Sequence, residues 1–221
     1  MNTRDIHKVV PILRKQVQGL DVPWLENMVH QDTLHRDPFK VLISCILSLR
    51  TQDKTTGEAS ERLFRRAPDV KSLSGLPVNT IEKLIYPVGF YRVKAERIKA
   101  LSSALIKKYD SKVPDEIDEL LTLKGVGRKT ANLVITLGYN KPGICVDTHV
   151  HRITNRWGYV KTKSPEQTEY ALRAKLPLQY WLEINGLLVA FGQGICRPIS
   201  PLCSGCDVHM FCSKVGVSRH R

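Results

Sequence analysis

Long apolar runs and a signal peptide are both missing from this sequence of 221 residues. No stretch approaches the roughly 20 consecutive apolar residues that a helix needs to cross a bilayer. Residues Met1 to Asp5 carry no apolar core of the kind that begins a signal peptide. We therefore expect no membrane partner and an intracellular location, where cysteine thiols stay reduced.

Acidic residues are scarce relative to basic ones. The chain has 34 Lys and Arg against 21 Asp and Glu, which gives a net charge of +13. This excess suits a polyanionic partner, because each cationic side chain set against a phosphate releases condensed counterions. A basic amphipathic helix with an aromatic face, which would favour a membrane surface, is not evident. Charge alone leaves open a folded protein that is merely basic.

A convincing alternating strand pattern is also lacking, and helical periodicity runs through most of the chain. Phe39, Leu42, Ile43, Ile46 and Leu47 form one apolar helical stripe. We predict an all-α fold with helices over residues 39–49, 53–66, 80–85, 93–109, 115–121, 128–137, 147–158 and 179–191, and a further one that begins at the capping box Ser164 to Gln167. Asp53 and Thr80 are expected to cap two of these helices, and Asp115 to start another.

Four of the six cysteines, Cys196, Cys203, Cys206 and Cys212, follow the spacing C-x6-C-x2-C-x5-C near the end of the chain. Four thiolates brought together by short loops hold either zinc or a [4Fe–4S] cluster. Structural zinc usually pairs its cysteines closely on both sides, and the six-residue gap fits that poorly. The spacing favours iron–sulfur and leaves zinc or unliganded thiols open. Cys45 and Cys145 lie in apolar runs and are interpreted as core residues.

The segment Gly125-Val126-Gly127 lies between two predicted helices. Glycine permits positive φ and a tight turn, so the amides of the turn and of the next helix can face a phosphate. Arg128 follows at once. A lone pair of glycines is more often a simple turn, so a phosphate clamp and a structural turn are both open here.

Lys129 and Asp147 each have two interpretations. Lys129 stands at the start of a helix, where the helix dipole and Arg128 disfavour an ammonium and favour a nucleophilic amine; a second phosphate contact is the alternative. Asp147 begins the following helix and is a natural N-cap. A helix from Lys129 to Gly138 rises roughly 14 Å, and residues 139–146 can span about 27 Å. The chain can therefore return Asp147 to the end of the helix that carries Lys129.

Three motifs in this order resemble the helix-hairpin-helix DNA glycosylases of the endonuclease III family: residues 123–132 (LKGVGRKTAN), residues 146–149 (VDTH) and the cysteine spacing. Residues 47–53 and 88–91 extend the likeness. The resemblance implies a two-lobed fold, with one six-helix lobe over residues 31–141. The other lobe, residues 1–30 and 142–221, would hold a [4Fe–4S] cluster in a C-terminal loop.

The resemblance also implies an activity: a bifunctional DNA N-glycosylase and AP lyase of base excision repair that removes oxidised pyrimidines. Its partner would be double-stranded DNA with damaged bases or abasic sites, bound by a monomer in the cytoplasm and nucleoid. Lys129 would be the nucleophile and Asp147 its catalytic carboxylate, with Cys196, Cys203, Cys206 and Cys212 as metal ligands. The implied DNA contacts are Arg50, Phe90, Gly125, Val126, Gly127, Arg128 and His149.

Two positions depart from the family pattern. Lys124 stands where the family often has proline, and Arg50 stands where a glutamine fills the gap left by a flipped base. Arg50 either enters the duplex, where a guanidinium suits a guanine opposite the lesion, or turns outward to a phosphate. Three other functions are weighed against the lyase: a monofunctional mismatch or adenine glycosylase, a non-catalytic DNA-binding module and an electron carrier. Lys129 argues against the first of them.

Overall fold

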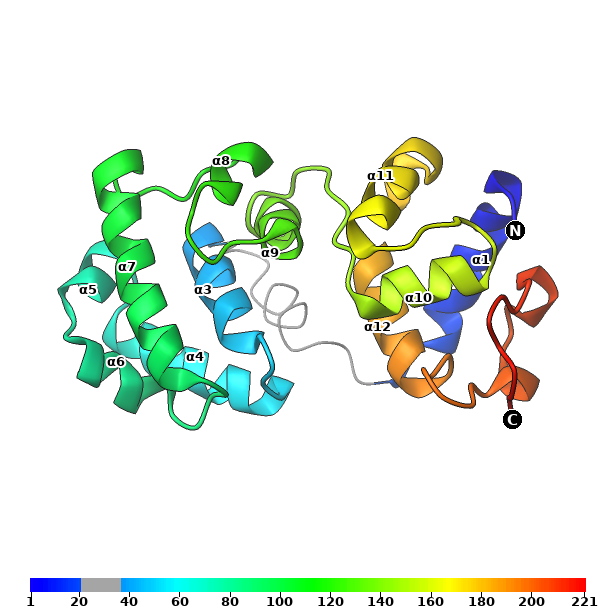
Figure 1. Cartoon of the computed structure of the whole chain (residues 1–221), viewed down its shortest axis with the longest axis horizontal. Helices are drawn as coiled ribbons and strands as arrows, with labels where there is room; N and C mark the ends of the chain where they lie inside the picture. The colour runs from blue at the N-terminus through cyan, green and yellow to red at the C-terminus, as the bar shows by residue number, and fades with distance from the viewer. Residues whose placement is uncertain (21–36) are drawn as a thin grey trace. The chain divides into compact units, whose positions relative to one another are not determined.

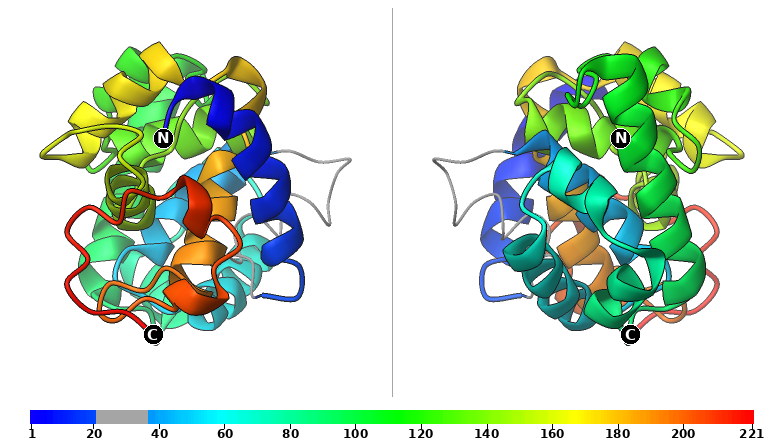
Figure 2. Two further views of the ribbon diagram at one scale, coloured as in Figure 1. Left: turned by 90° about the vertical axis from the view of Figure 1, so that its right-hand side faces the viewer. Right: turned by 90° about the vertical axis from the view of Figure 1, so that its left-hand side faces the viewer.

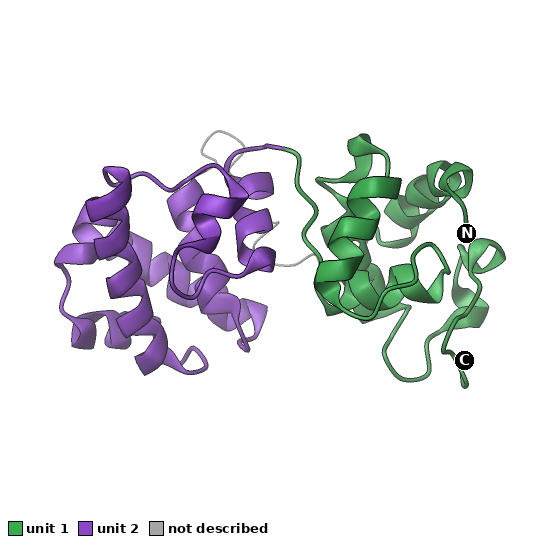
Figure 3. Ribbon diagram, turned by 45° about the horizontal axis from the view of Figure 1, so that its top comes forward, with its two compact units in different colours: residues 1–23, 142–221 green, residues 24–141 purple. Residues whose placement is uncertain are grey.

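Helices form all the regular structure in residues 1–20 and 37–221, which are the residues that the computed structural model describes. No β-strand occurs in those two ranges, which confirms the all-α prediction (Figure 1). The chain divides into two units, one of Met1–Pro23 with Pro142–Arg221 and one of Trp24–Lys141 (Figure 3). The predicted border between residues 30 and 31 lies outside the described residues.

The unit Trp24–Lys141 is organised around α3, whose buried residues face almost every direction. Asp37 caps α3 by accepting hydrogen bonds from the amides of Phe39 and Lys40, and Pro38 supplies the first helical residue. The α-helices between Pro38 and Leu133 are α3 (Pro38–Ser48), α4 (Asp53–Arg66), α5 (Val70–Gly75), α6 (Val78–Ile85), α7 (Tyr91–Tyr109), α8 (Ile117–Leu121) and α9 (Arg128–Leu133).

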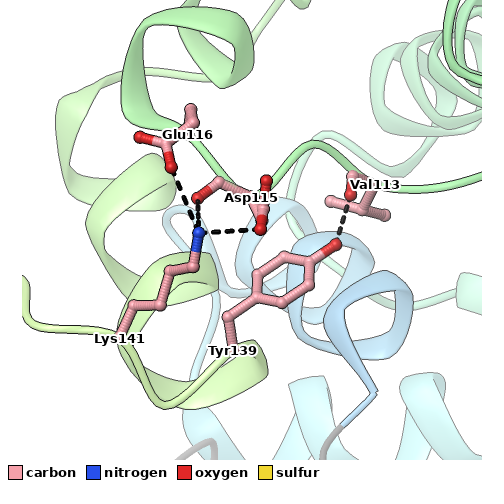
Figure 4. Close-up of polar contacts among 5 residues, drawn as sticks. All are labelled: Val113, Asp115, Glu116, Tyr139 and Lys141. Carbon is pink, nitrogen blue, oxygen red and sulfur yellow. Dashed lines mark hydrogen bonds and ion pairs between the residues drawn. The ribbon is translucent and has the colours of Figure 1, made fainter.

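A π-helical turn, η1 (Val134–Gly138), continues α9 and ends at Pro38, where a Cβ on Gly138 would lie 2.9 Å from the Pro38 Cα. Beyond it, Lys141 binds the carboxylates of Asp115 at 2.7 Å and Glu116 at 3.1 Å, and the Tyr139 hydroxyl donates to the Val113 carbonyl (Figure 4). These contacts attach the chain just after η1 to the loop before α8. The C-terminal end of the α9–η1 segment is therefore held both by Pro38 and by this loop.

The other unit has a separate apolar core, in which Trp157, Tyr159 and Phe191 are fully buried. Its elements are α1 (Thr3–Gln16), α10 (Thr148–Arg156), α11 (Pro165–Lys175), η2 (Leu178–Tyr180), α12 (Ile184–Gly194), η3 (Cys203–Gly205) and η4 (His209–Phe211). Helix α1 packs against α12, close to the C-terminal segment (Figure 2, left). The Gln16 side chain donates to the Gly205 carbonyl at 2.7 Å and accepts from the Asp207 amide at 3.2 Å. The first helix thereby holds residues 196–212, which carry the four C-terminal cysteines and are called the cysteine loop.

The helix predicted over residues 53–66 is confirmed, but the roles predicted for Asp53, Thr80 and Asp115 at helix starts are wrong. Helix α4 is capped by the extended Gln52, with Asp53 as its first helical residue, and α6 begins at Val78 after Pro77, which places Thr80 inside it. Helix α8 begins two residues after Asp115, whose side chain and carbonyl accept from Lys141 instead of capping a helix. Pro77 before α6 and the Lys141 partner of Asp115 fix the chain more strongly than the local capping preference.

Two further predictions need correction in the second half of the chain. The helix expected over 179–191 is divided into η2 and α12 (Ile184–Gly194). Ser164 caps α11 as predicted, but Gln167 reaches back to the amide of Lys163 and not to that of Ser164. In the ranges that the structure describes, no helix is both long and apolar enough to cross a membrane.

Candidate functional site

The Leu123–Arg128 hairpin joins α8 to α9. Gly125 has φ +91°, and a Cβ there would lie 2.5 Å from Cδ of Arg97, so the position requires glycine. Gly127 is extended, at φ −101°, and no atom lies within 4 Å of a Cβ built on it. Only Gly125 is therefore needed for the turn. Gly127 is the N-cap residue of α9 and has no side chain that could accept from the first amides of the helix. The space in front of these amides is therefore open.

Side chains of the hairpin divide by burial. Val126 is buried and its amide donates to the Leu123 carbonyl at 3.0 Å, which fixes the turn. Lys124 and Lys129 are exposed, and Arg128 is half-buried. Lys129 is the second residue of α9, whose following residues Thr130 to Leu133 are all buried. The helix is thus anchored on one side and presents its first lysine to solvent.

Arg50 and Phe90 lie on two adjacent loops of the same unit. Both adopt the left-handed conformation, with φ of 54° and 58°, which is uncommon for non-glycine residues. The Arg50 guanidinium lies 5.8 Å from the centroid of the Phe90 ring. Both side chains are exposed. The structure thereby brings together two of the predicted DNA contacts that are 40 residues apart in the sequence.

Asp147 and His149 belong to the other unit, Met1–Pro23 with Pro142–Arg221. Asp147 is half-buried and its Oδ1 accepts from the amides of His149 at 2.8 Å and Val150 at 2.9 Å, so it is the N-cap of α10. His149 Nδ1 lies 3.1 Å from Arg152, which is only a donor, so Nδ1 accepts and the neutral ring carries its proton on Nε2. A Cβ on Gly192 would lie 2.3 Å from that nitrogen, so α12 must have glycine there.

The four C-terminal cysteines line one small cavity with a volume of about 20 Å³. Its other walls are mainly apolar, with the cations of Arg156 and Lys214 among them. Arg156 donates to Cys196 Sγ at 3.5 Å, and the Lys214 amide donates to Cys212 Sγ at 3.3 Å. Cationic and amide donors aimed at sulfur stabilise thiolates, which are the form that binds metal.

Burial, with smaller contributions from the neighbouring thiols of Cys196, Cys212 and Cys203, raises the pKa of Cys206 to about 11. Burial also raises the pKa of Cys212. Clustered thiols of this kind become thiolates when metal cations replace their protons. Among the described residues, no three His, Cys, Asp or Glu side chains converge on a point suited to one ion.

Sequence reasoning missed two groups of residues that support these sites. Arg152 and Arg156 of α10 hold the start of the cysteine loop, because Arg152 donates to the Cys196 carbonyl at 2.8 Å and Arg156 to the Arg197 and Pro198 carbonyls at 2.6 Å each. Lys94 is buried, and its ammonium donates to the carbonyl of Leu49, next to Arg50. Its spacing to Ile98, Leu101 and Leu105 places it on the apolar face of α7, which was the available signal.

Comparison with known proteins gives consistent results. The family described as "HhH-GPD superfamily base excision DNA repair protein" matches residues 43–178. Endonuclease III of Thermotoga maritima is 49% identical over 183 residues, which are 83% of this chain and 84% of that protein. Endonuclease III-like protein 1 of Bos taurus is 46% identical over 177 residues, but the chain spans only 58% of its length.

Among solved structures, a trapped endonuclease III–DNA covalent intermediate (an estranged-adenine complex) is similar to this chain. Its TM-score is 0.82 with 31% sequence identity, and the match covers 97% of both chains. A non-covalent endonuclease III–DNA complex gives the same TM-score of 0.82 and the same identity, 31%. The likeness therefore includes both the cysteine segment and the hairpin.

Proposed function

Because this chain belongs to the endonuclease III family of HhH-GPD base excision DNA repair proteins, we propose that Lys129 and Asp147 carry out its chemistry. The protein is a DNA glycosylase with AP lyase activity that acts on damaged duplex DNA. We propose oxidised pyrimidines as its substrates. The observation that carries the residue assignment is the hairpin, which presents an exposed lysine in the first turn of a helix anchored by buried residues.

The proposed nucleophile is the Lys129 amine. It attacks C1′ of the deoxyribose, a C1′–N bond forms, and the glycosidic bond breaks with its electron pair leaving on the base, which gains a proton. The sugar ring opens to give a protonated Schiff base between Lys129 and C1′. Loss of a C2′ proton then expels the 3′ phosphate by β-elimination, and water hydrolyses the Schiff base. The strand is nicked and the amine is restored.

Asp147 is proposed to accept the proton that the attacking amine must lose. A carboxylate also stabilises the positive charge that develops on the sugar as the base departs. Its capping bonds to the amides of His149 and Val150 orient one carboxylate oxygen along the axis of α10. The N-cap role and the catalytic role are thus compatible in one side chain.

DNA contacts are proposed in two groups. Gly125, Gly127 and Arg128 face a phosphate with amides and one guanidinium, which binds DNA without reading its sequence, and Val126, whose amide donates to the Leu123 carbonyl, holds the turn between them. Arg50 and Phe90 contact the position of the flipped base, and His149 contacts DNA from the other unit. Flipping costs least at a damaged or abasic position, which favours such substrates.

We further propose that Cys196, Cys203, Cys206 and Cys212 hold a [4Fe–4S] cluster. The shared cavity, the donors to Cys196 and Cys212 and the cations in the wall all suit four thiolates. The cluster would supply a structural cross-link for a loop that otherwise has only short 3-10 turns. No catalytic step is assigned to it.

Borohydride trapping tests the proposed chemistry directly. Duplexes that contain thymine glycol, uracil, 8-oxoguanine or an abasic site are incubated with the protein and sodium borohydride, and covalent complexes are separated by electrophoresis. We expect trapping on the abasic and thymine glycol duplexes and little on an undamaged one. A monofunctional glycosylase, a DNA-binding module or an electron carrier would form no reducible bond, so the absence of any trapped complex would reject the lyase.

A further inference from the structure

One buried cation lies beneath the two loops that carry Arg50 and Phe90. Lys94, in the first turns of α7, is 4% exposed. Its ammonium donates to the Leu47 carbonyl at 2.8 Å, the Leu49 carbonyl at 2.6 Å and Thr51 Oγ1 at 3.1 Å. All three acceptors are neutral. Burial of an ammonium is costly, and burial and the nearby Arg97 lower the pKa of Lys94 to about 8.

The three acceptors of Lys94 all belong to the C-terminal end of α3 and the chain that follows it. Arg50 stands between two of them, in its left-handed conformation. Such a conformation persists only where the surroundings hold it. A helix end with three bonds to one ammonium is held in this way. We call residues 48–52 the Arg50 loop.

A second loop, residues 86–90, is attached at the same point and is called the Phe90 loop. The amide of Gly89 donates to Thr51 Oγ1 at 3.2 Å, so this hydroxyl accepts from both Gly89 and Lys94. A Cβ on Gly89 would lie 2.6 Å from the Arg50 carbonyl oxygen. The two loops are therefore in close backbone contact, and the Lys94 ammonium is bonded to the hydroxyl that joins them.

We propose that Lys94 is a positioning residue that holds the Arg50 loop against the Phe90 loop, so that Arg50 and Phe90 together recognise the flipped or abasic position of DNA. This inference rests on the proposed function. Phe90 is 63% exposed and Arg50 is exposed, whereas Lys94 is buried and acts only through the loops.

Lys99 provides a matched control on the same helix. Its ammonium also donates to main-chain carbonyls at the end of a helix, those of Ser74 and, at 2.8 Å, Leu76. Ser74 lies in the last turn of α5 and Leu76 just after it, where no DNA contact is proposed. Lys94→Met and Lys99→Met therefore remove the same kind of interaction, and only the first affects the Arg50 loop.

The experiment measures affinity for two duplexes, one undamaged and one with a tetrahydrofuran abasic analogue, which lacks the C1′ hydroxyl and cannot form a Schiff base. The readout is the affinity for the duplex with the abasic analogue divided by the affinity for the undamaged duplex. We expect Lys94→Met and Arg50→Ala each to lower this ratio by about tenfold, because one strong contact is worth about that factor. The ratio should fall no further in the double variant with both Lys94→Met and Arg50→Ala than in either single variant, because both substitutions act on one contact. Lys99→Met should keep the ratio within about twofold of the parent protein.

A Lys94→Met ratio within about twofold of the parent value would overturn the proposal, and so would an equal loss in Lys99→Met. If Lys94→Met does not fold, Thr51→Val decides, because it removes the shared acceptor and leaves Lys94 both carbonyls. Its ratio should fall by roughly threefold, and an unchanged ratio would overturn the proposal. Trapping of the parent protein is measured separately, so lost lyase chemistry is distinguished from lost positioning.

Discussion

Individual residues in this chain combine structural and chemical roles. Asp147 is an N-cap and a proposed catalytic carboxylate, and Lys129 occupies an ordinary helical position while it is proposed as the nucleophile. The local structure at both residues is explained without a catalytic role. The proposed catalytic roles are therefore tested by substitutions that keep the structural role of each residue and remove its chemical group.

Lys129→Ala should abolish borohydride trapping and strand nicking and leave duplex binding nearly intact. Alanine is a good helix former and the side chain is exposed, so the fold should not change. Lys124→Ala is the control, because it removes an exposed lysine of the same hairpin and should weaken binding without loss of trapping. Trapping by Lys129→Ala at the parent level would assign the nucleophile to another residue.

Asp147→Asn should excise bases at least roughly 10²-fold more slowly with almost unchanged thermal stability, because asparagine keeps the cap but not the charge. Asp69→Asn is a matched control: Asp69 caps α5 by accepting from the Ser72 amide at 2.8 Å, and no catalytic role is proposed for it. Single-turnover excision and thermal melting should be measured for both. Normal excision by a stable Asp147→Asn protein would leave Asp147 as a cap alone.

The pKa of Lys94, lowered to about 8 by burial and by Arg97, predicts a pH dependence of stability. Between about pH 8 and 10.5 the unfolded chain binds more protons at this lysine than the folded chain does, so its contribution to stability rises with pH. The difference in unfolding free energy between the parent protein and Lys94→Met should therefore move in favour of the parent from pH 7.5 to 9.5. A difference that stays constant over this range would contradict the lowered pKa.

At the scale of elements, helix ends and loops carry the proposed functions. The hairpin before α9, the Arg50 loop after α3 and the cysteine loop after α12 are each anchored by a helix of their own unit. The regular structure of the cysteine loop is limited to two 3-10 turns. A metal cross-link is the strongest stabilising interaction proposed for it.

Cys203→Ser should remove iron from the purified protein and expose the cysteine loop to proteases, because the remaining thiols cannot complete the proposed set of four ligands. Metal analysis should find about four irons per parent chain and no stoichiometric zinc. Cys45→Ala is the control: burial raises the pKa of Cys45 to about 12, and its thiol is a core group that should not affect the iron content. One zinc and no iron in the parent protein would reject the cluster.

The whole molecule carries a net charge of +13 and acts on a polyanion. Each phosphate contact releases counterions, so affinity for any duplex falls as salt rises. The contribution is independent of sequence and of damage. Recognition of damage must therefore come from the loops and the proposed catalytic residues rather than from charge.

Affinity for an undamaged duplex should fall at least about tenfold between 50 and 200 mM salt. Arg128→Ala should reduce the slope of log affinity against log salt by about one, because one phosphate contact is removed. Lys108→Ala, in the basic last turn of α7 and not among the proposed DNA contacts, is the comparison, with an expected smaller change. An unchanged slope for Arg128→Ala would remove it from the phosphate contacts.

The sequence alone determined the helical class and the order of the motifs, because apolar periodicity and cysteine spacing are local properties. It also determined the Asp147 cap, which depends on a side chain and the next few amides. It failed at the starts of α6 and α8, where Pro77 or the distant Lys141 outweighs local capping preferences.

Only the tertiary structure decided which groups are neighbours. The contact of Arg50 with Phe90, the three bonds of Lys94 and the common cavity of the four cysteines join residues that are far apart in sequence or separated by irregular chain. Burial made Lys94 a structural cation and left Lys129 exposed, although both are lysines near the start of a helix. The physical reason is that solvation and hydrogen-bond partners depend on packing, which no local pattern specifies.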